Sequence, residues 1–242
     1  MQCKLCLQEK PLIKESHIIP RKFFQKASDN IDKGFGSVKH GDRAGRLYSI
    51  KSKSYQLQSG IHVRDILCGD CEQKLGIFDN SAQTILLQNK DIEKNDENLW
   101  KVPNIHYTKL KLFFMSVLWR SQICDHHFFS AVKLTSDLEA QLRDMIIQQN
   151  SDIENKFPVI LLRYSGVEAN NFYVSKWDQP CEMYYFRLGN YTFIIKVDEN
   201  SWPDPFQEYM LKPEEDLLIP VLPYKETKGY QLLLDNIDKY KP

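Results

Sequence analysis

Two pairs of cysteines are the residues in this chain with the most defined chemistry. Cys3 and Cys6 form one Cys-x-x-Cys pair, and Cys68 and Cys71 form another. Each pair places two sulfur atoms on one tight turn, so the two pairs together can close a tetrahedral site of four thiolates around Zn²⁺. We therefore predict a structural zinc ion at these cysteines. The 61 residues between Cys6 and Cys68 are too many for a compact zinc ribbon, which indicates that this segment carries a function.

His17 is the best candidate for that function. It stands in the run Glu15-Ser16-His17-Ile18-Ile19-Pro20, between the two cysteine pairs. A histidine can act as a general base, although a histidine beside apolar residues can also belong to a hydrophobic core. The position of His17 between the two pairs favours the functional interpretation.

The cysteine pairs, the run Ser16-His17-Ile18-Ile19-Pro20-Arg21 and the segment Ile66-Leu67-Cys68-x-x-Cys71-Glu72 together resemble the zinc-stapled HNH endonucleases of the ββα-metal type. In that family a histidine at the end of the first strand activates water to attack a phosphodiester. A divalent cation stabilises the phosphate and the leaving oxygen. The resemblance implies that His17 is the general base, that DNA is the substrate and that Mg²⁺ or Mn²⁺ is the catalytic cation. Glu72 falls where many relatives carry a metal-binding histidine.

Two positions depart from the family pattern. Ser16, a weak ligand, stands where many relatives have Asp or His, and Val63 stands where the middle Asn of the motif is expected. His62 and Asp65 lie close enough in sequence to substitute. These departures support a second hypothesis from a different class, a zinc-stapled module that binds nucleic acid or a protein partner without catalysis.

Glu72 and Asp79 are the candidate carboxylate ligands of the catalytic cation. They lie seven residues apart at the start of a predicted helix, so they share one helix face, which can point back at His17. Carboxylate oxygens suit a hard divalent cation. The alternative for Glu72 is a carboxylate stabilised by the helix dipole at the N-terminus, and the two roles are compatible. For Asp79 a structural role is favoured over binding of the cation.

The charge of the chain is balanced overall but not along its length. Residues 1–90 hold 15 Lys and Arg against 9 Asp and Glu, a difference of +6, and residues 91–242 hold 17 against 23, a difference of −6. A basic first part is typical of a surface that meets phosphate. The candidate nucleic-acid-binding residues are Arg21, Lys22, Arg43 and Arg46. A solvated loop is the alternative interpretation of residues 28–58.

The predicted elements divide the chain into two modules. The polar segment 90–98 has no hydrophobic period and is predicted to link residues 1–90, the HNH-like module, to residues 99–242. We predict strands at 15–20, 61–67, 157–164, 181–188, 191–197 and 217–222, and helices at 72–88, 107–124, 136–149 and 229–240. The fold class is thus α+β: an N-terminal ββα-metal, zinc-stapled module followed by a C-terminal α+β module with two helices and a mostly antiparallel sheet.

The two helices that begin the second module carry more specific expectations. Apolar spacing in helix 107–124 predicts a single buried face, with Lys109, Lys111 and Arg120 on the solvated side. In helix 136–149, Ser136 is the predicted N-cap, and Glu139 completes a capping box. The run Cys124-Asp125-His126-His127 between them is predicted to be a loop and not a second metal site.

The expected setting is a reducing cytoplasm. The chain has no secretory leader and no apolar run of the roughly 18 residues that cross a bilayer. Paired cysteines without an export signal favour thiolate–metal chemistry over disulfides. The second module has no recognisable catalytic motif, which leaves binding of a protein partner open. The resemblance implies an effector of a prokaryotic phage-defence or mobile-element system.

Overall fold

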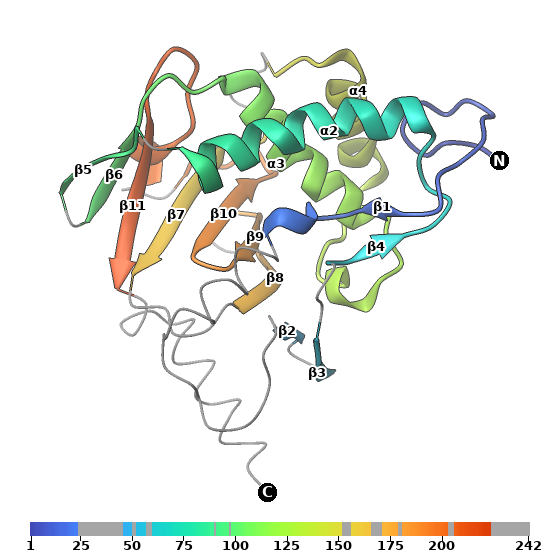
Figure 1. The fold of residues 1–242 in the computed structure, drawn as a ribbon, viewed down its shortest axis with the longest axis horizontal. Helices are drawn as coiled ribbons and strands as arrows, with labels where there is room; N and C mark the ends of the chain where they lie inside the picture. Colours follow the sequence, from blue (N-terminus) through green and yellow to red (C-terminus); the bar gives the residue numbers. More distant parts are fainter. Residues whose placement is uncertain are drawn as a thin grey trace, which may run out of the picture.

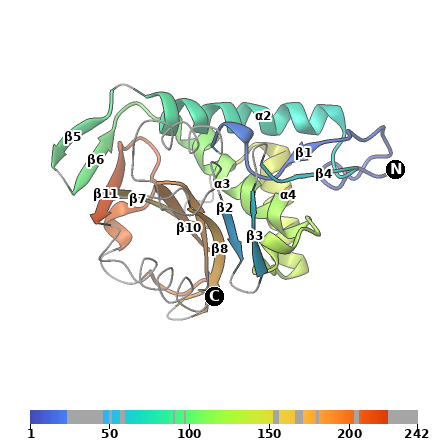
Figure 2. The same ribbon diagram turned by 60° about the horizontal axis from the view of Figure 1, so that its bottom comes forward.

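The computed structural model describes residues 1–23, 46–49, 52–56, 60–89, 91–96, 98–151, 156–165, 171–178, 181–202 and 206–223. Within these residues a nine-stranded sheet has the order β3-β2-β8-β9-β10-β7-β11-β6-β5, and a separate two-stranded sheet pairs β1 with β4. Helices α2, α3 and α4 lie on one side of the large sheet, and α3 lies between α2 and the sheet (Figures 1 and 2). The α+β class predicted from the sequence is confirmed.

The strands of the large sheet come from both ends of the chain. They are β2 (Arg46–Ser49), β3 (Ser52–Gln56), β5 (Glu93–Asp96), β6 (Leu99–Val102), β7 (Val159–Ser165), β8 (Asn171–Trp177), β9 (Met183–Leu188), β10 (Tyr191–Lys196) and β11 (Leu217–Pro223). The sheet is mostly antiparallel, as predicted; the exceptions within the described strands are the parallel pairs β2–β8 and β7–β11. The predicted hairpin at Gly189-Asn190 joins β9 to β10, and Gly189 adopts the left-handed backbone (φ 63°) that such a turn requires.

The remaining elements are short strands and helices. Strands β1 (Ser16–His17) and β4 (His62–Val63) are followed by α2 (Gly69–Gln83), a π-helical turn (Thr84–Gln88), α3 (Tyr107–Gln122), a 3-10 turn (His127–Phe129), α4 (Ser136–Gln148) and a second 3-10 turn (Phe206–Tyr209). The N-cap of α4 is Thr135 and not Ser136 as predicted, because the Thr135 side chain accepts a hydrogen bond from the Leu138 N–H at 3.3 Å. None of the described helices is both long and apolar enough to span a membrane.

Helix α3 is buried on every side, which corrects the prediction of a single buried face. All residues from Leu110 to Ser121 are buried, because α2, α4 and β10 surround the helix. Lys111 and Arg120 are each only 1% exposed, so they do not lie on a solvated side. A helix with this environment forms the centre of a core instead of covering one.

The segment expected to be a linker contributes strand β5 to the sheet instead. β5 pairs with β6, and β6 in turn pairs with β11. A polar sequence suits β5 because it is the edge strand, where charged side chains discourage further pairing. Residues 28–58, for which a solvated loop is one interpretation of the sequence, contain β2 and β3. The helix predicted at 229–240 lies outside the described residues.

The two predicted modules pack on one shared hydrophobic core. Residues from Cys3 to Ile219 belong to a single buried cluster. A row of aromatic rings runs through it: Phe23 stacks on Phe113 at 5.6 Å between centroids, and Phe114 lies 4.8 Å from Phe193, which stacks on Phe186 at 4.8 Å. Aromatic pairs at these distances add to the stabilisation from burial alone. Described residues on both sides of segment 90–98 therefore contribute to the same buried cluster.

Candidate metal centre and the strand beside it

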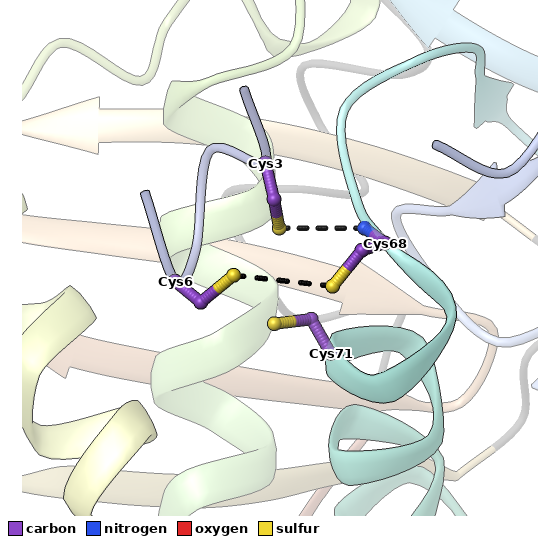
Figure 3. A group of neighbouring side chains, drawn as sticks. All are labelled: Cys3, Cys6, Cys68 and Cys71. Carbon is purple, nitrogen blue, oxygen red and sulfur yellow. Dashed lines mark hydrogen bonds between the residues drawn. The ribbon is translucent and has the colours of Figure 1, made fainter. Parts of the chain in front are cut away.

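The first cysteine pair lies on a tight turn held by its own main chain. The N–H of Leu7 donates to the Cys3 carbonyl at 2.9 Å, and Leu7 adopts a left-handed backbone (φ 59°). The N–H of Cys3 donates to Gln8, which closes a small hairpin. This turn aims the sulfurs of Cys3 and Cys6 toward the start of α2 (Figure 3).

The second pair lies where the chain enters α2. Cys68 is the N-cap residue of the helix, and Cys71 lies in its first turn. The two pairs are joined by main-chain hydrogen bonds, from Lys4 N–H to the Ile66 carbonyl at 2.9 Å and from Ile13 N–H to the Leu67 carbonyl at 2.9 Å. The structure thus holds both turns in place through the backbone as well as through the cysteines.

The four sulfur atoms converge on one point. All lie within 4.8 Å of one another, and the Sγ atoms of Cys6 and Cys68 are 3.9 Å apart. A tetrahedral Zn²⁺ with sulfur at about 2.3 Å requires neighbouring sulfurs about 3.8 Å apart. All six cysteines of the chain are free of disulfides. The group can therefore hold a metal ion such as zinc with only small movements of the side chains.

The acid–base properties of these thiols fit a cation site. Burial raises the pKa values of the Cys6 and Cys71 thiols above their ordinary range. Burial also acts on Cys3, but hydrogen bonds from backbone N–H groups, including that of Cys68, outweigh it and bring the pKa of Cys3 down to about 7. Four thiolates in one cluster repel each other, and a bound cation removes that repulsion.

His17 lies on β1 directly opposite His62 on β4. The two residues are register partners, and their ring centroids are 5.9 Å apart. His17 is half-buried and His62 is exposed. Residues opposite each other on antiparallel strands project to the same face. His62, which lies close enough in sequence to substitute for the Asn of the motif, thus faces His17 across β1 and β4.

Glu72 lies on the other side of β1, next to Ser16. Ser16 is fully buried, and neighbouring side chains on a strand point to opposite faces. Burial is the largest cause acting on the Glu72 carboxyl, and it raises the pKa. The charge of Arg120 and the nearby Ser16 hydroxyl act to lower this pKa, and the charge of Asp79 acts to raise it. Glu72 Oε2 and Ser16 Oγ are both buried without a well-formed hydrogen bond. Glu72 Oε2 therefore lies near the Ser16 hydroxyl without a hydrogen bond of good geometry.

Asp79, by contrast, has both carboxylate oxygens engaged by Arg120 of α3. Its Oδ1 accepts from Nη2 at 2.7 Å, and its Oδ2 accepts from Nη1 at 3.0 Å. The same guanidinium donates to the main-chain carbonyl of His17. The spacing of Glu72 and Asp79 predicted that they share one helix face, but it could not predict the contact with Arg120, which is distant in sequence. The only sequence feature that pointed to this contact was an arginine within an apolar helix.

The candidate nucleic-acid-binding residues are only partly described. Arg21 and Lys22 are exposed just after β1. Arg46 begins β2 and pairs with Asn171 through its main chain, and Arg43 lies outside the described residues.

The run from Cys124 to His127 forms a loop and the start of a 3-10 turn, with His126 Nδ1 accepting from the Phe128 N–H. Among the described residues, Cys3, Cys6, Cys68 and Cys71 are the one group of three or more potential ligands that converges.

Comparison of the chain with protein-family models, with curated proteins and with solved structures finds no match.

Proposed function

We propose that this protein is a metal-dependent endonuclease of the HNH type that hydrolyses phosphodiester bonds in DNA. The proposal rests on one arrangement: the cysteine cluster joins strand β1, which carries His17, to the start of helix α2, which carries Glu72. The order strand, strand, helix around such a cluster is the order that the resemblance implies for a ββα-metal site. The cluster has the sulfur spacing expected for structural Zn²⁺.

In this mechanism His17 takes a proton from the attacking water. Proton removal by a positioned histidine typically accelerates such a reaction by about 10²–10⁴-fold. His62 faces His17 and helps to orient the water or the phosphate. Glu72 would hold Mg²⁺ or Mn²⁺ through Oε2, which makes no well-formed hydrogen bond, and the cation would stabilise charge on the phosphate and the leaving oxygen. Arg21 and Lys22 would contact neighbouring phosphates without reading the base sequence.

The decisive experiment measures nicking of plasmid DNA with Mg²⁺ or Mn²⁺ by the wild type, His17→Ala and His127→Ala. His127 is exposed and lies in the 3-10 turn that follows α3, so its variant is a matched control. We expect His17→Ala to lower the cleavage rate by about 10²–10⁴-fold, with unchanged zinc content and DNA affinity. Excess cation should partly restore Glu72→Gln but not His17→Ala. Full cleavage by His17→Ala would refute the assignment of the base.

A second candidate is a zinc-stapled module that binds nucleic acid or a protein without cleaving. It is favoured by the position of Glu72 on the Ser16 side of β1 and by the engagement of both Asp79 oxygens. If the wild type cleaves neither DNA nor RNA with any divalent cation, this candidate replaces the first. DNA affinity should then fall by about 0.9 log unit per log unit of salt for each phosphate contacted. A double variant Arg21→Gln, Lys22→Gln should lower that slope.

The proposed setting is the cytoplasm, where thiols stay reduced and thiolate–metal sites persist. The free state of all six cysteines supports this part of the proposal. A role as an effector of a prokaryotic phage-defence or mobile-element system, with a protein partner recognised through residues 99–242, follows from the resemblance. Loss of that role in cells that express His17→Ala would connect it to cleavage.

A further inference from the structure

Arg120 is the most completely bonded charged side chain near β1. Its guanidinium is 1% exposed and uses all five of its N–H donors. The acceptors are the Ser116 carbonyl (3.2 Å from Nε), Ser116 Oγ (3.1 Å from Nη2), the two oxygens of Asp79, and the His17 carbonyl (2.9 Å from Nη1). One side chain thus connects α3, α2 and β1.

The pairing with Asp79 makes this burial tolerable. A buried guanidinium without a counter-ion is strongly unfavourable, whereas a bidentate carboxylate satisfies its charge and fixes its plane. The Asp79 side chain is 14% exposed, so the pair is largely shielded from water. A fully satisfied buried network of this kind is rigid. Asp79 therefore fixes the direction in which Arg120 offers its remaining donors.

The contact with His17 is made to the main chain of a very short strand. β1 has two residues and pairs only with β4, which also has two. Such a pair of strands is weak on its own. The charge-assisted hydrogen bond from Arg120 holds the peptide group that carries the His17 side chain, and the direction of the imidazole depends on that peptide.

We propose that Arg120 is a positioning residue for His17 and that Asp79 is its counter-ion. This inference rests on the proposed role of His17 as the general base. It assigns a function to the second part of the chain, because α3 supplies the group that orients the base. It also gives Asp79 a role that differs from that of a cation ligand. Variants of Asp79 should then resemble variants of Arg120 and should not be rescued by excess cation.

The test compares Arg120→Lys and Asp79→Asn with Lys111→Met. Lysine keeps the charge of Arg120 but cannot reach Asp79 and the His17 carbonyl together in the same geometry. Lys111 lies on the same helix with the same 1% exposure, and its Nζ donates to the Tyr107 hydroxyl and the Ser151 carbonyl. Lys111→Met therefore controls for the loss of a buried cation from α3.

We expect Arg120→Lys and Asp79→Asn to lower kcat by about 10²-fold with unchanged KM and zinc content, because a misplaced catalytic group affects the reaction more than substrate binding. Lys111→Met should keep the wild-type kcat. The second measurement is the ¹H–¹³C resonance of the His17 ring, assigned by its absence in His17→Ala. It should shift or broaden in Arg120→Lys and Asp79→Asn and stay in place in Lys111→Met.

The two measurements separate this inference from the proposed function. If the His17 resonance shifts in Arg120→Lys but the wild type cleaves nothing, the positioning role is kept and the nuclease is rejected. Wild-type cleavage with an unchanged resonance and kcat in Arg120→Lys would overturn the positioning role and keep the nuclease. If Arg120→Lys does not fold, the milder Asp79→Asn decides by the same criteria.

Discussion

The end of the molecule that carries the cysteines and the core around α3 are stabilised in different ways. The cysteine end consists of turns, two strands of two residues each and the first turn of α2, and its centre is a cluster of four thiols. Around α3, twelve consecutive residues are buried among helices and the sheet. The first region offers a site where a cation can add to its stability, whereas the second is held together by apolar burial. The same protein can therefore lose order at one end while the other persists.

Removal of the metal should produce the largest effect and should be confined to the cysteine end. A structural zinc ion of this kind contributes on the order of 10 kcal/mol to the folding of its module. With a strong chelator, amide exchange should accelerate in residues 1–20 and 60–75, while residues 110–121 and 183–196 stay protected. Equal loss of protection throughout the chain would show that the two regions unfold together.

Truncation of an aromatic ring in the core should destabilise the region around α3 and leave the metal bound at the cysteine end. Phe113 is fully buried between Phe23, Phe114 and Phe193. Phe113→Ala should lower the free energy of unfolding by about 3–5 kcal/mol, measured by urea denaturation. The folded variant should retain its zinc. Ile77→Ala, at a 49% exposed apolar position on α2, is the control and should change stability little. Stoichiometric loss of zinc from folded Phe113→Ala would contradict the distinction.

Acidity should weaken only the metal-dependent end. Since burial raises the pKa values of Cys6 and Cys71, their protons must leave before a metal binds. The apparent zinc affinity should fall as pH is lowered, by about 1.4 kcal/mol per displaced proton per pH unit. In the metal-free protein these two groups make stability depend on pH in the opposite direction. Their raised pKa contributes stability to the fold below about pH 8.5, and this contribution is lost as pH rises. Competition titrations and thermal unfolding of the metal-free form measure the two trends.

The smallest predicted effect is a gain of stability in α2, the helix common to both regions. Gly76 lies in its middle, and a Cβ there would meet no atom within 4 Å beyond the helix itself. Gly76→Ala should therefore raise the free energy of unfolding by roughly 0.5–1 kcal/mol. The gain should appear with or without zinc, since α2 packs on α3. A loss of stability would indicate that α2 must bend at this position.

Local patterns in the sequence predicted the parts of the fold that depend on neighbouring residues. The cysteine spacing predicted the cluster, and Gly189-Asn190 predicted the β9–β10 hairpin. Strand β8 and the pairing of β2 with it were not predicted, because parallel pairing between distant segments leaves no local signal. The burial of Lys111 and Arg120 was missed for a related reason. Their partners, among them Ser151 and the His17 carbonyl, are distant in sequence, so the amphipathic pattern misassigned them to solvent.

The parallel pair β2–β8 also bears on how the chain behaves while it is being made. Arg46 and Leu47 leave the ribosome long before Asn171 and Phe172, with which they pair. At a synthesis rate of about 5–20 residues per second, the first strand waits on the order of 10 s for its neighbour. A lone hairpin with an open edge is marginally stable and prone to associate with other chains during that interval. We therefore expect the nascent protein to need chaperone protection, and its earliest-synthesised strands to be among the last to reach their final place.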